Sequence, residues 1–257
     1  MSEVLVSRTG GVLELRLDRA AKKNALTFAM YAALTEGLQQ AQADPGVRAA
    51  LITANGETFC AGNDIGEFLK PRDDLPGSRA APPTRFIDQL VAFDKPLVAA
   101  VQGAAVGIGA TMLLHCDLVY AAPTTRLRMP FVSLGLVPEA GSSLLLPRRV
   151  GDVVAAEMLL LGAWIHAERA RDLRLINDIV PSVTELGPFA RQRAEELAAC
   201  PPDALRMTRA LLRGDAATLR ARIESEGAAF ARCLTSPEAR EAFTAFLERR
   251  PPDFSKP

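Results

Sequence analysis

Hydrophobic and polar positions alternate with a period of two at the start of the chain. Between residues 12 and 17 leucines alternate with Glu14 and Arg16, and another short β-like run, over residues 3–8, precedes a Gly10-Gly11 turn. Such alternation is typical of a strand with one face on the core and the other in water. We therefore predict a β-hairpin over residues 3–17 with one solvent-exposed face.

Beyond the hairpin, short apolar runs alternate with segments of helical periodicity. Thr27 is placed to cap a helix that reaches about residue 42. Apolar runs that we interpret as strands follow at residues 47–54, 97–103 and 117–122, with helical patterns between them. Because strands that alternate with helices usually form parallel βαβ units with right-handed crossovers, the expected fold class is α/β.

The pattern changes after Pro181, where almost every segment has helical periodicity. The predicted helices cover residues 184–199, 203–213, 216–233 and 237–249. We divide the chain into a core of residues 1–181 and a helical C-terminal region of residues 182–257, which we expect to serve packing and oligomerisation. Its apolar positions, which would pack either on a partner or within the same chain, include Leu205, Leu211, Leu212, Leu219 and Ile223.

Length and charge narrow the classes of function. A chain of 257 residues is long enough for one main domain with a sizeable core. Thirty basic residues balance thirty acidic ones, so the sequence lacks the strong positive charge that nucleic acid or an anionic membrane surface attracts. Its apolar runs are far shorter than the roughly 20 residues that span a bilayer. We expect a soluble protein that binds neither nucleic acid nor membrane.

Cysteines and histidines indicate a reducing compartment and no metal chemistry. The four cysteines are widely spaced and form no Cys-x-x-Cys pair, and neither His115 nor His166 belongs to a recognisable nucleophile motif. The first residues also lack the pattern of a signal peptide. We therefore expect a cytoplasmic protein without a metal site and without a Ser-His-Asp triad.

Two glycine-bearing loops each follow a predicted strand. They are FCAGND, residues 59–64, and GAAVGIG, residues 103–109, and they fall where ligands gather in α/β sheets. Gly62 and Gly107 would let the backbone turn its amides toward a ligand oxygen. Close packing of helix on strand explains either loop alone about as well. A dinucleotide-binding motif matches poorly, because its third glycine falls on Met112 and no acidic residue follows at the required spacing.

Five short motifs follow one another along the chain. They are KNAL (23–26), AGND (61–64), QGAAVGIG (102–109), CDLVY (116–120) and PFVSLGLVPEAG (130–141). Their series resembles the crotonase (enoyl-CoA hydratase/isomerase) family. The resemblance implies a crotonase (ClpP/crotonase-like) fold of repeated ββα units with a helical C-terminal region. It also implies an acyl-CoA thioester substrate, no cofactor beyond the coenzyme A that the substrate carries, and a homotrimer or hexamer.

The resemblance assigns an oxyanion hole and a substrate site by position. The backbone N–H groups of Asn63 and Ile108 would bind the thioester oxygen, on which charge develops when the neighbouring carbon loses a proton. The other residues implied to contact coenzyme A or substrate are Lys23, Ala25, Leu26, Ala61, Gly62, Asp64, Ile65, Gly107, Phe131 and Leu134. From its place in the chain, Asp64 is interpreted mainly as a cap or loop organiser.

Thr111 and Phe131 occupy the two positions at which hydratases of the family carry glutamates. Neither side chain can act as a general base at neutral pH, so we do not expect efficient hydration by the usual mechanism. Glu139 remains, placed as in the Δ3,Δ2-enoyl-CoA isomerases, where one carboxylate moves a proton from C2 to C4. Apolar neighbours such as Phe131 and Leu136 would raise the pKa of Glu139, and Phe131 would help to keep water out.

Three alternatives stay open. Glu139 follows Pro138 and precedes a predicted helix, so its charge could simply complement the dipole of that helix. The protein could be a hydratase or another enolate-forming enzyme, such as a thioesterase or lyase. It could also bind acyl-CoA with little catalysis. The resemblance favours an isomerase with Glu139 as its base.

Overall fold

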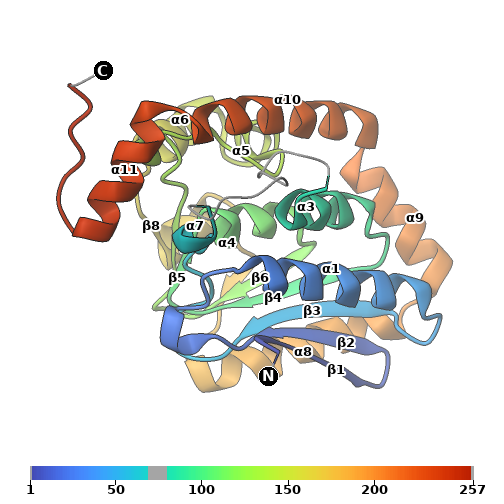
Figure 1. Ribbon diagram of the computed structural model, residues 1–257. Coiled ribbons are helices and arrows are strands. Elements are labelled where there is room, and N and C mark those ends of the chain that lie inside the picture. Colours follow the sequence, from blue (N-terminus) through green and yellow to red (C-terminus); the bar gives the residue numbers. More distant parts are fainter. Residues whose placement is uncertain (1, 69–79, 256–257) are drawn as a thin grey trace.

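A six-stranded sheet lies at the centre of the computed structural model, which describes residues 2–68 and 80–255 (Figure 1). The strands in spatial order are β1 (Val4–Thr9), β2 (Val12–Leu17), β3 (Ala49–Ala54), β4 (Leu97–Val101), β6 (Leu118–Ala121) and β9 (Asp178–Ile179). β1 and β2 are antiparallel, and all the other neighbours pair in parallel. The predicted hairpin and the predicted parallel organisation are confirmed.

A second, three-stranded sheet begins where the chain turns after β4. It consists of β5 (Ala104–Val106), β7 (Arg126–Arg128) and β8 (Ile165–His166). Gly103 makes the turn with φ 60°, and a Cβ atom there would lie 1.9 Å from the carbonyl oxygen of Glu57. The strand predicted over residues 97–103 therefore ends at Val101, because the turn requires a residue with a positive φ and no side chain.

Helices pack on both faces of the six-stranded sheet. α1 (Phe28–Ala43) and α3 (Pro82–Ala92) share a large hydrophobic core with one face. Thr27 caps α1 as predicted, since its Oγ1 accepts a hydrogen bond from Met30 N at 3.2 Å. α8 (Val183–Ala199) contacts β3 and β4 within a second apolar cluster. The sheet is therefore the middle of three layers.

Glu14 shows the consequence of the third layer for β2. Its side chain is 2% exposed, accepts a hydrogen bond from Thr53 Oγ1 at 2.6 Å and pairs with Arg191 of α8. The predicted solvent-exposed face of the hairpin is wrong at this strand. A helix 177 residues further along the chain covers it, which a local alternation of residues does not reveal.

Shorter helices connect these layers. They are α2 (Ile65–Phe68), α4 (Ile108–Thr111), α5 (Ser142–Val150), α6 (Asp152–Leu160) and α7 (Ala167–Asp172), with the 3-10 helices η1 (Ala20–Lys22), η2 (Met112–His115) and η3 (Val132–Leu134). α4 and α5 start directly after the glycine-rich loop and the segment of Glu139, so both place backbone amides near the predicted site. Within the described residues, no helix is both long and apolar enough to cross a membrane.

Three helices follow α8, as predicted: α9 (Pro202–Arg213), α10 (Ala216–Leu234) and α11 (Pro237–Glu248). α10 lies across α5 and α3 (Figure 1). Ile223 is buried and Leu219 packs against the main core, whereas Leu211 and Leu212 are each 83% exposed. The apolar positions of this region thus divide between the core and the surface. The division of the chain at residue 181 stays a prediction.

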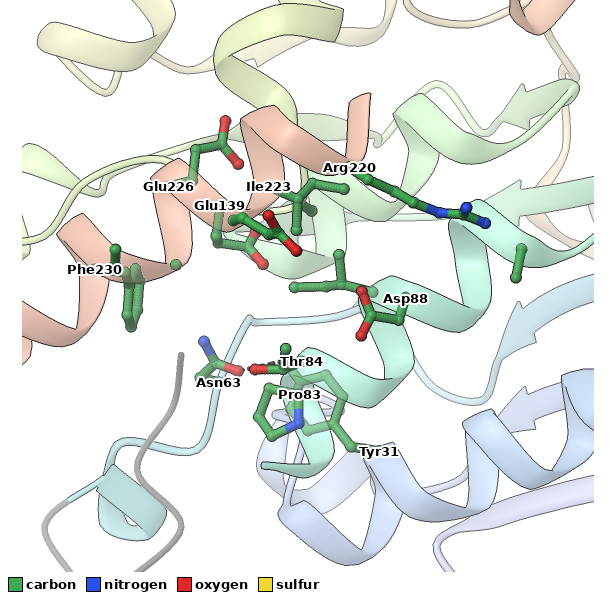
Figure 2. Close-up of a pocket in the computed structure, with 16 residues that line it drawn as sticks. Tyr31, Asn63, Pro83, Thr84, Asp88, Glu139, Arg220, Ile223, Glu226 and Phe230 are labelled. Carbon is green, nitrogen blue, oxygen red and sulfur yellow. Dashed lines mark hydrogen bonds between the residues drawn. The ribbon is translucent and has the colours of Figure 1, made fainter. Parts of the chain in front are cut away.

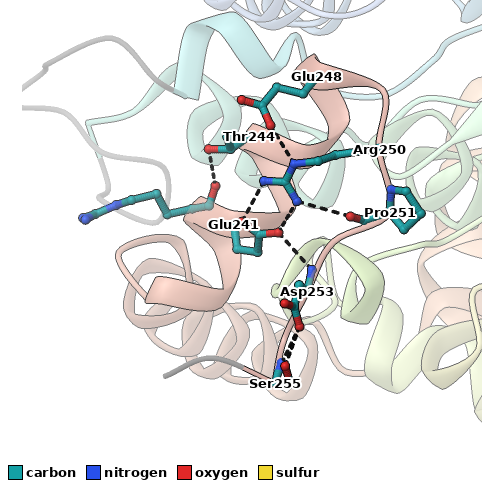
Figure 3. Close-up of polar contacts among 8 residues, drawn as sticks. Glu241, Thr244, Glu248, Arg250, Pro251, Asp253 and Ser255 are labelled. Atoms are coloured by element: carbon teal, nitrogen blue, oxygen red, sulfur yellow. Dashed lines mark hydrogen bonds and ion pairs between the residues drawn. The ribbon is translucent and has the colours of Figure 1, made fainter.

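Ion pairs and hydrogen bonds join the segment that follows α11 to that helix (Figure 3). The Arg250 guanidinium donates to both carboxylate oxygens of Glu241, at 2.5 and 3.0 Å, and to Glu248 at 2.6 Å. Asp253 N donates to Glu241 at 2.9 Å. The hydrogen bonds that Glu241 accepts, chiefly those from Arg250 and then the one from Asp253 N, lower its pKa to about 2. The segment after α11 is thereby held against that helix.

Candidate active site

The two glycine-bearing loops lie side by side because β3 and β4 are neighbouring parallel strands. Cys60 N donates to Ala104 O at 3.1 Å, and Val106 N donates to Cys60 O at 2.9 Å. Gly62 and Gly107 follow with φ angles of 96° and 54°, and a Cβ atom on Gly107 would lie 4.0 Å from Gly62 Cα. The loops therefore meet at the glycines that the sequence singles out.

The residue after each glycine has an available backbone amide. Neither Asn63 N nor Ile108 N donates a hydrogen bond to another described residue. Ile108 is the first residue of α4, where N–H groups have no acceptor inside the helix. The Asn63 side chain is held from α1, because its oxygen accepts a hydrogen bond from the Tyr31 hydroxyl (Figure 2). Two neighbouring free amides suit an oxyanion; that role stays a prediction.

The KNAL loop runs beside the first glycine loop. Ala61 N donates to Lys23 O at 3.0 Å, and Leu26 N donates to Gly62 O at 2.8 Å. The buried side chain of Asn24 fixes the turn by donating to the carbonyl oxygens of Asn55 and Thr58, at 2.9 and 2.7 Å. Lys23 is exposed, whereas the Leu26 side chain is buried in the core. A contact of Leu26 with coenzyme A would therefore have to use its backbone.

Asp64 holds the start of α2. Its Oδ1 accepts a hydrogen bond from Gly66 N at 2.9 Å, and its Oδ2 accepts one from Arg19 Nη1 at 2.7 Å. The same Arg19 nitrogen donates to Ala25 O at 2.9 Å. The interpretation of Asp64 as a loop organiser is confirmed. Arg19 joins the KNAL loop to the segment of Asp64 and Ile65.

Glu139 is partly buried, and one side chain of the described residues donates a hydrogen bond to its carboxyl. Thr111 Oγ1, on α4, donates to Glu139 Oε1 at 2.5 Å. Burial raises the pKa of Glu139 from 4.5 to about 8, against the lowering effect of the Thr111 hydroxyl and with a further rise from the charge of Glu226. The predicted direction of this pKa shift is confirmed. The carboxyl is thus a stronger base than an ordinary glutamate.

The start of α5 decides whether Glu139 complements a helix dipole. The Gly141 and Ser143 amides, which stand at that helix start, donate to Glu226 of α10 at 2.6 and 2.9 Å. Ser142 N donates to the backbone oxygen of Glu139 at 3.0 Å. The side chain of Glu139 turns toward Thr111 instead. The carboxylate that accepts hydrogen bonds from the start of α5 is that of Glu226. The interpretation of Glu139 as a charge that complements the dipole of this helix is therefore wrong.

Glu139 and Asn63 line one cavity of about 560 Å³ (Figure 2). Its walls come from α1, α3 and α10, from the first glycine loop at Asn63, and from the segment of Glu139 and Ala140. The wall residues of these helices include Tyr31, Pro83, Thr84, Ile87, Asp88, Arg220, Ile223, Glu224, Glu226 and Phe230. The cavity therefore brings the predicted base and one predicted oxyanion amide to the same space, beneath a helix of the C-terminal region.

Phe131 and Leu134 are outside this wall. Phe131 is buried in the hydrophobic core, and Leu134 packs against that core. Their segment, η3, packs on α11 so closely that a Cβ atom at Gly135 would lie 2.6 Å from Ala239 N. Phe131 is not among the described residues that line the cavity, and its expected part in excluding water stays a prediction.

The whole chain, and with it this site, matches a known family. The model of the family described as enoyl-CoA hydratase/isomerase matches residues 7–257. The chain belongs to this family. It is similar to a solved structure of an enoyl-CoA hydratase/isomerase from Pseudoalteromonas atlantica T6c, with a TM-score of 0.94 and 39% identity over 98% of this chain and 100% of that one. A structure of Pseudomonas aeruginosa OdaA has a TM-score of 0.92 and 45% identity, covering 97% and 100%. The predicted crotonase fold is confirmed.

Relatives within the enoyl-CoA hydratase/isomerase family include both hydratases and isomerases. An Escherichia coli (strain K12) protein named 2,3-dehydroadipyl-CoA hydratase is 36% identical over 99% of each chain. Rat enoyl-CoA delta isomerase 2 is 33% identical over 96% of this chain and 64% of its own length. Membership of the family therefore establishes an acyl-CoA enzyme of hydratase or isomerase type. The residues of the site have to distinguish between these two reactions.

The family motifs do not include all the residues that shape this cavity. Tyr31 belongs to a helix that the sequence shows simply as packing on the core, and nothing local links it to Asn63. Glu226 has a sequence signal: it lies on α10 between the apolar positions Ile223 and Phe230, as a lone charge on a buried face. Thr111 stands out in the sequence only as a missing glutamate, although its hydroxyl is the partner of the base.

Proposed function

We propose that the protein is a Δ3,Δ2-enoyl-CoA isomerase with Glu139 as its single acid-base group. The observation that carries the proposal is the placement of the partly buried Glu139 carboxyl on the cavity that Asn63 also lines. The two hydratase positions provide no carboxylate there: Thr111 donates to Glu139, and Phe131 lies in the core. One carboxyl and two amides are the groups that a 1,3-proton shift requires.

In this reaction the thioester oxygen of a 3-enoyl-CoA would accept hydrogen bonds from Asn63 N and Ile108 N. Glu139 would take a proton from C2, and the electron pair of that C–H bond would delocalise onto the thioester oxygen as a dienolate. The oxyanion amides stabilise this charge where it develops. Glu139, now protonated, would return the proton at C4, and the double bond would move to C2–C3. Protons and charge balance without any further reactant.

The pKa of about 8 suits a group that must both take and return one proton. A base acts best when its pKa lies near the working pH, because it is then partly ionised and still strong. Burial supplies the rise, and the Thr111 hydroxyl limits it by favouring the charged form. Glu139 is therefore expected to exchange protons readily near neutral pH.

Hydration is the second candidate, and the E. coli relative named a hydratase favours it. Hydration needs a group that activates water in addition to a proton donor for C2. Glu226 is the glutamate whose charge acts on Glu139, but its two oxygens already accept hydrogen bonds from Gly141 and Ser143. Asp88 and Glu224 also line the cavity, but neither stands at a position where the family's hydratases carry a glutamate. We therefore rank isomerisation above hydration. Formation of 3-hydroxyacyl-CoA as fast as 2-enoyl-CoA would reverse this order.

The test is the variant Glu139→Gln, assayed with 3-enoyl-CoA thioesters of several chain lengths. The panel should include an acyl chain that ends in a carboxylate, because one relative is named for dehydroadipyl-CoA. Loss of a general base typically lowers turnover by about 10²–10⁴-fold, whereas affinity for a saturated acyl-CoA should be retained. An unchanged rate in the folded variant would show that Glu139 is not the base. Binding by the parent without turnover of any thioester would indicate a non-catalytic acyl-CoA-binding protein.

A further inference from the structure

Glu226 is a buried carboxylate that the proposed reaction does not use. It lies in the middle of α10, is 6% exposed and shares the cavity wall with Glu139. Its Oε2 accepts a hydrogen bond from Gly141 N at 2.6 Å; its Oε1 accepts from Ser143 N at 2.9 Å and from Ser143 Oγ at 2.5 Å. Three donors satisfy this buried charge, as burial of a carboxylate requires.

These bonds fix the segment that carries Glu139. Gly141 is the N-cap of α5 and has no side chain of its own, so the cap comes from a helix 85 residues away. Charge at this position is favourable, because the first amides of a helix lack partners and form the positive end of its dipole. Glu226 therefore fastens the start of α5 to α10.

The turn between Glu139 and α5 has a strained backbone and is held by hydrogen bonds from outside the turn. Ala140 and Gly141 have φ angles of 59° and 72°, and a left-handed conformation costs free energy for a residue with a side chain. His115 Nε2 hydrogen-bonds to Ala140 O at 2.7 Å on the other side of the turn. Burial lowers the pKa of His115 to about 4, so at neutral pH it is uncharged and can donate this bond. The turn is thus held by one group from η2 and one from α10.

We infer that Glu226 is a positioning residue for proton transfer, which acts by holding the Glu139 turn in register with the oxyanion amides. This inference rests on the proposed function of Glu139. Glu226 does not exchange protons with the substrate, since its oxygens are taken up by Gly141 and Ser143. α10 thereby becomes part of the active site, and the C-terminal region contributes to catalysis as well as to packing.

The variant Glu226→Gln tests the inference. Its amide can present one oxygen to Ser143, but its NH2 group would face the N–H of Gly141, so the bond nearest Glu139 is lost. Displacement of a reacting group by about 1 Å can cost about a hundredfold in rate. We expect kcat to fall about tenfold to a hundredfold while KM changes less than about threefold. Rates should be compared at about pH 9, where Glu139 is ionised in both proteins.

Two control variants separate positioning from general loss of stability. Ser143→Ala removes one of the three bonds and leaves both amide contacts, so it should lower kcat less than about threefold. Asp215→Ala removes a different carboxylate cap, which accepts hydrogen bonds from Ala217 N and Thr218 N at the exposed start of α10. It should reduce stability and leave kcat unchanged. If Glu226→Gln does not fold, Glu226→Asp keeps the charge but withdraws it from Gly141, and the same fall in kcat is expected.

The double variant Glu139→Gln/Glu226→Gln completes the test, with exchange of the C2 proton in deuterated water as a sensitive readout. If Glu226 acts through Glu139, adding its substitution to Glu139→Gln lowers the residual rate less than about twofold. An unchanged kcat in Glu226→Gln, or an equal fall in both backgrounds, would overturn the inference alone. Parent-like turnover in Glu139→Gln would overturn the proposed function and this inference with it.

Discussion

Glu139 and Glu226 are two carboxylates on one cavity with opposite surroundings. Glu226 accepts three hydrogen bonds from the start of α5. Glu139 accepts one, from Thr111, and burial raises its pKa to about 8. The hydrogen bonds around Glu226 stabilise its charged form, whereas the surroundings of Glu139 disfavour its charged form. A group held in this way is typical of a functional site rather than of a structural ion pair.

The raised pKa of Glu139 predicts a pH-dependent cost in stability. Because the folded protein binds this proton more tightly than the unfolded chain, the proton's stabilising effect is complete below pH 4.5 and is lost as the pH rises to about 8. Glu139→Gln has no such loss, so it should be more stable than the parent by about 2–4 kcal/mol at pH 8. The difference should nearly vanish at pH 4.5.

Denaturant unfolding at several pH values measures this difference. Glu226→Gln is the matched control, because it removes a carboxylate that is well hydrogen-bonded in the folded state. It should destabilise the protein at pH values at which Glu139→Gln stabilises it. A lower stability of Glu139→Gln than of the parent at pH 8 would contradict the prediction.

At the scale of single residues, the sequence predicts the base but not the side-chain contacts that hold the site. Glu139 is recognisable because it is a lone charge in an apolar run that matches a family motif. Its contact with Thr111 joins residues 28 apart, and the Tyr31–Asn63 contact joins residues 32 apart. Neither contact leaves a local pattern, since a threonine and a tyrosine in apolar helices are compatible with simple core packing.

At the scale of elements, parallel pairing of β3 and β4 places the two loops next to each other. The alternation of strands with helices predicts parallel strands, and the glycines predict where the chain turns. The hairpin's exposed face is predicted wrongly, because period-two alternation cannot show that α8 covers Glu14 with Arg191. The strand that ends at Val101 is predicted too long for a related reason: the turn at Gly103 depends on the nearby Glu57 carbonyl.

Gly107 offers a test of the oxyanion loop. Its φ and ψ angles of 54° and −123° suit glycine and strain any other residue. Gly107→Ala should therefore shift the Ile108 amide, lowering kcat about a hundredfold if that amide binds the oxyanion. The strain should also cost about 1–3 kcal/mol of stability.

Gly10→Ala is the control for Gly107→Ala. Gly10 has a similar φ of 56° and lies in the β1–β2 turn, where a Cβ atom would have no described neighbour within 4 Å. It should lose stability through the strain of a positive φ and keep kcat. Equal turnover in the two variants, with KM unchanged, would argue against the proposed oxyanion role.

At the scale of the whole molecule, segments far apart in the sequence close the site. α1 and α3 form one wall of the cavity and α10 forms the opposite part (Figure 2). The sequence predicts α10 as a helix with an apolar face but does not indicate what that face covers. The domain division at residue 181 describes the change in secondary structure, whereas the cavity draws on residues from both sides of that boundary.

Exposed apolar side chains on the C-terminal helices predict self-association. Leu211, Leu212 and Met207 on α9 are largely exposed, as are Phe246 and Leu247 on α11. Monomeric soluble proteins rarely expose large contiguous apolar patches. With the resemblance to trimeric and hexameric crotonases, these surfaces lead us to expect a homotrimer, or a hexamer formed from two trimers.

Light scattering after size-exclusion chromatography tests this expectation. The measured mass should be about three or six times the 27.5 kDa of one chain. The double substitution Leu211→Glu/Leu212→Glu places two charges on the exposed face of α9 and should lower the mass. Leu5→Glu makes the same change at an exposed leucine of β1 and should leave the mass unchanged. A parent protein with the mass of a single chain would show that the exposed leucines of α9 do not mediate self-association.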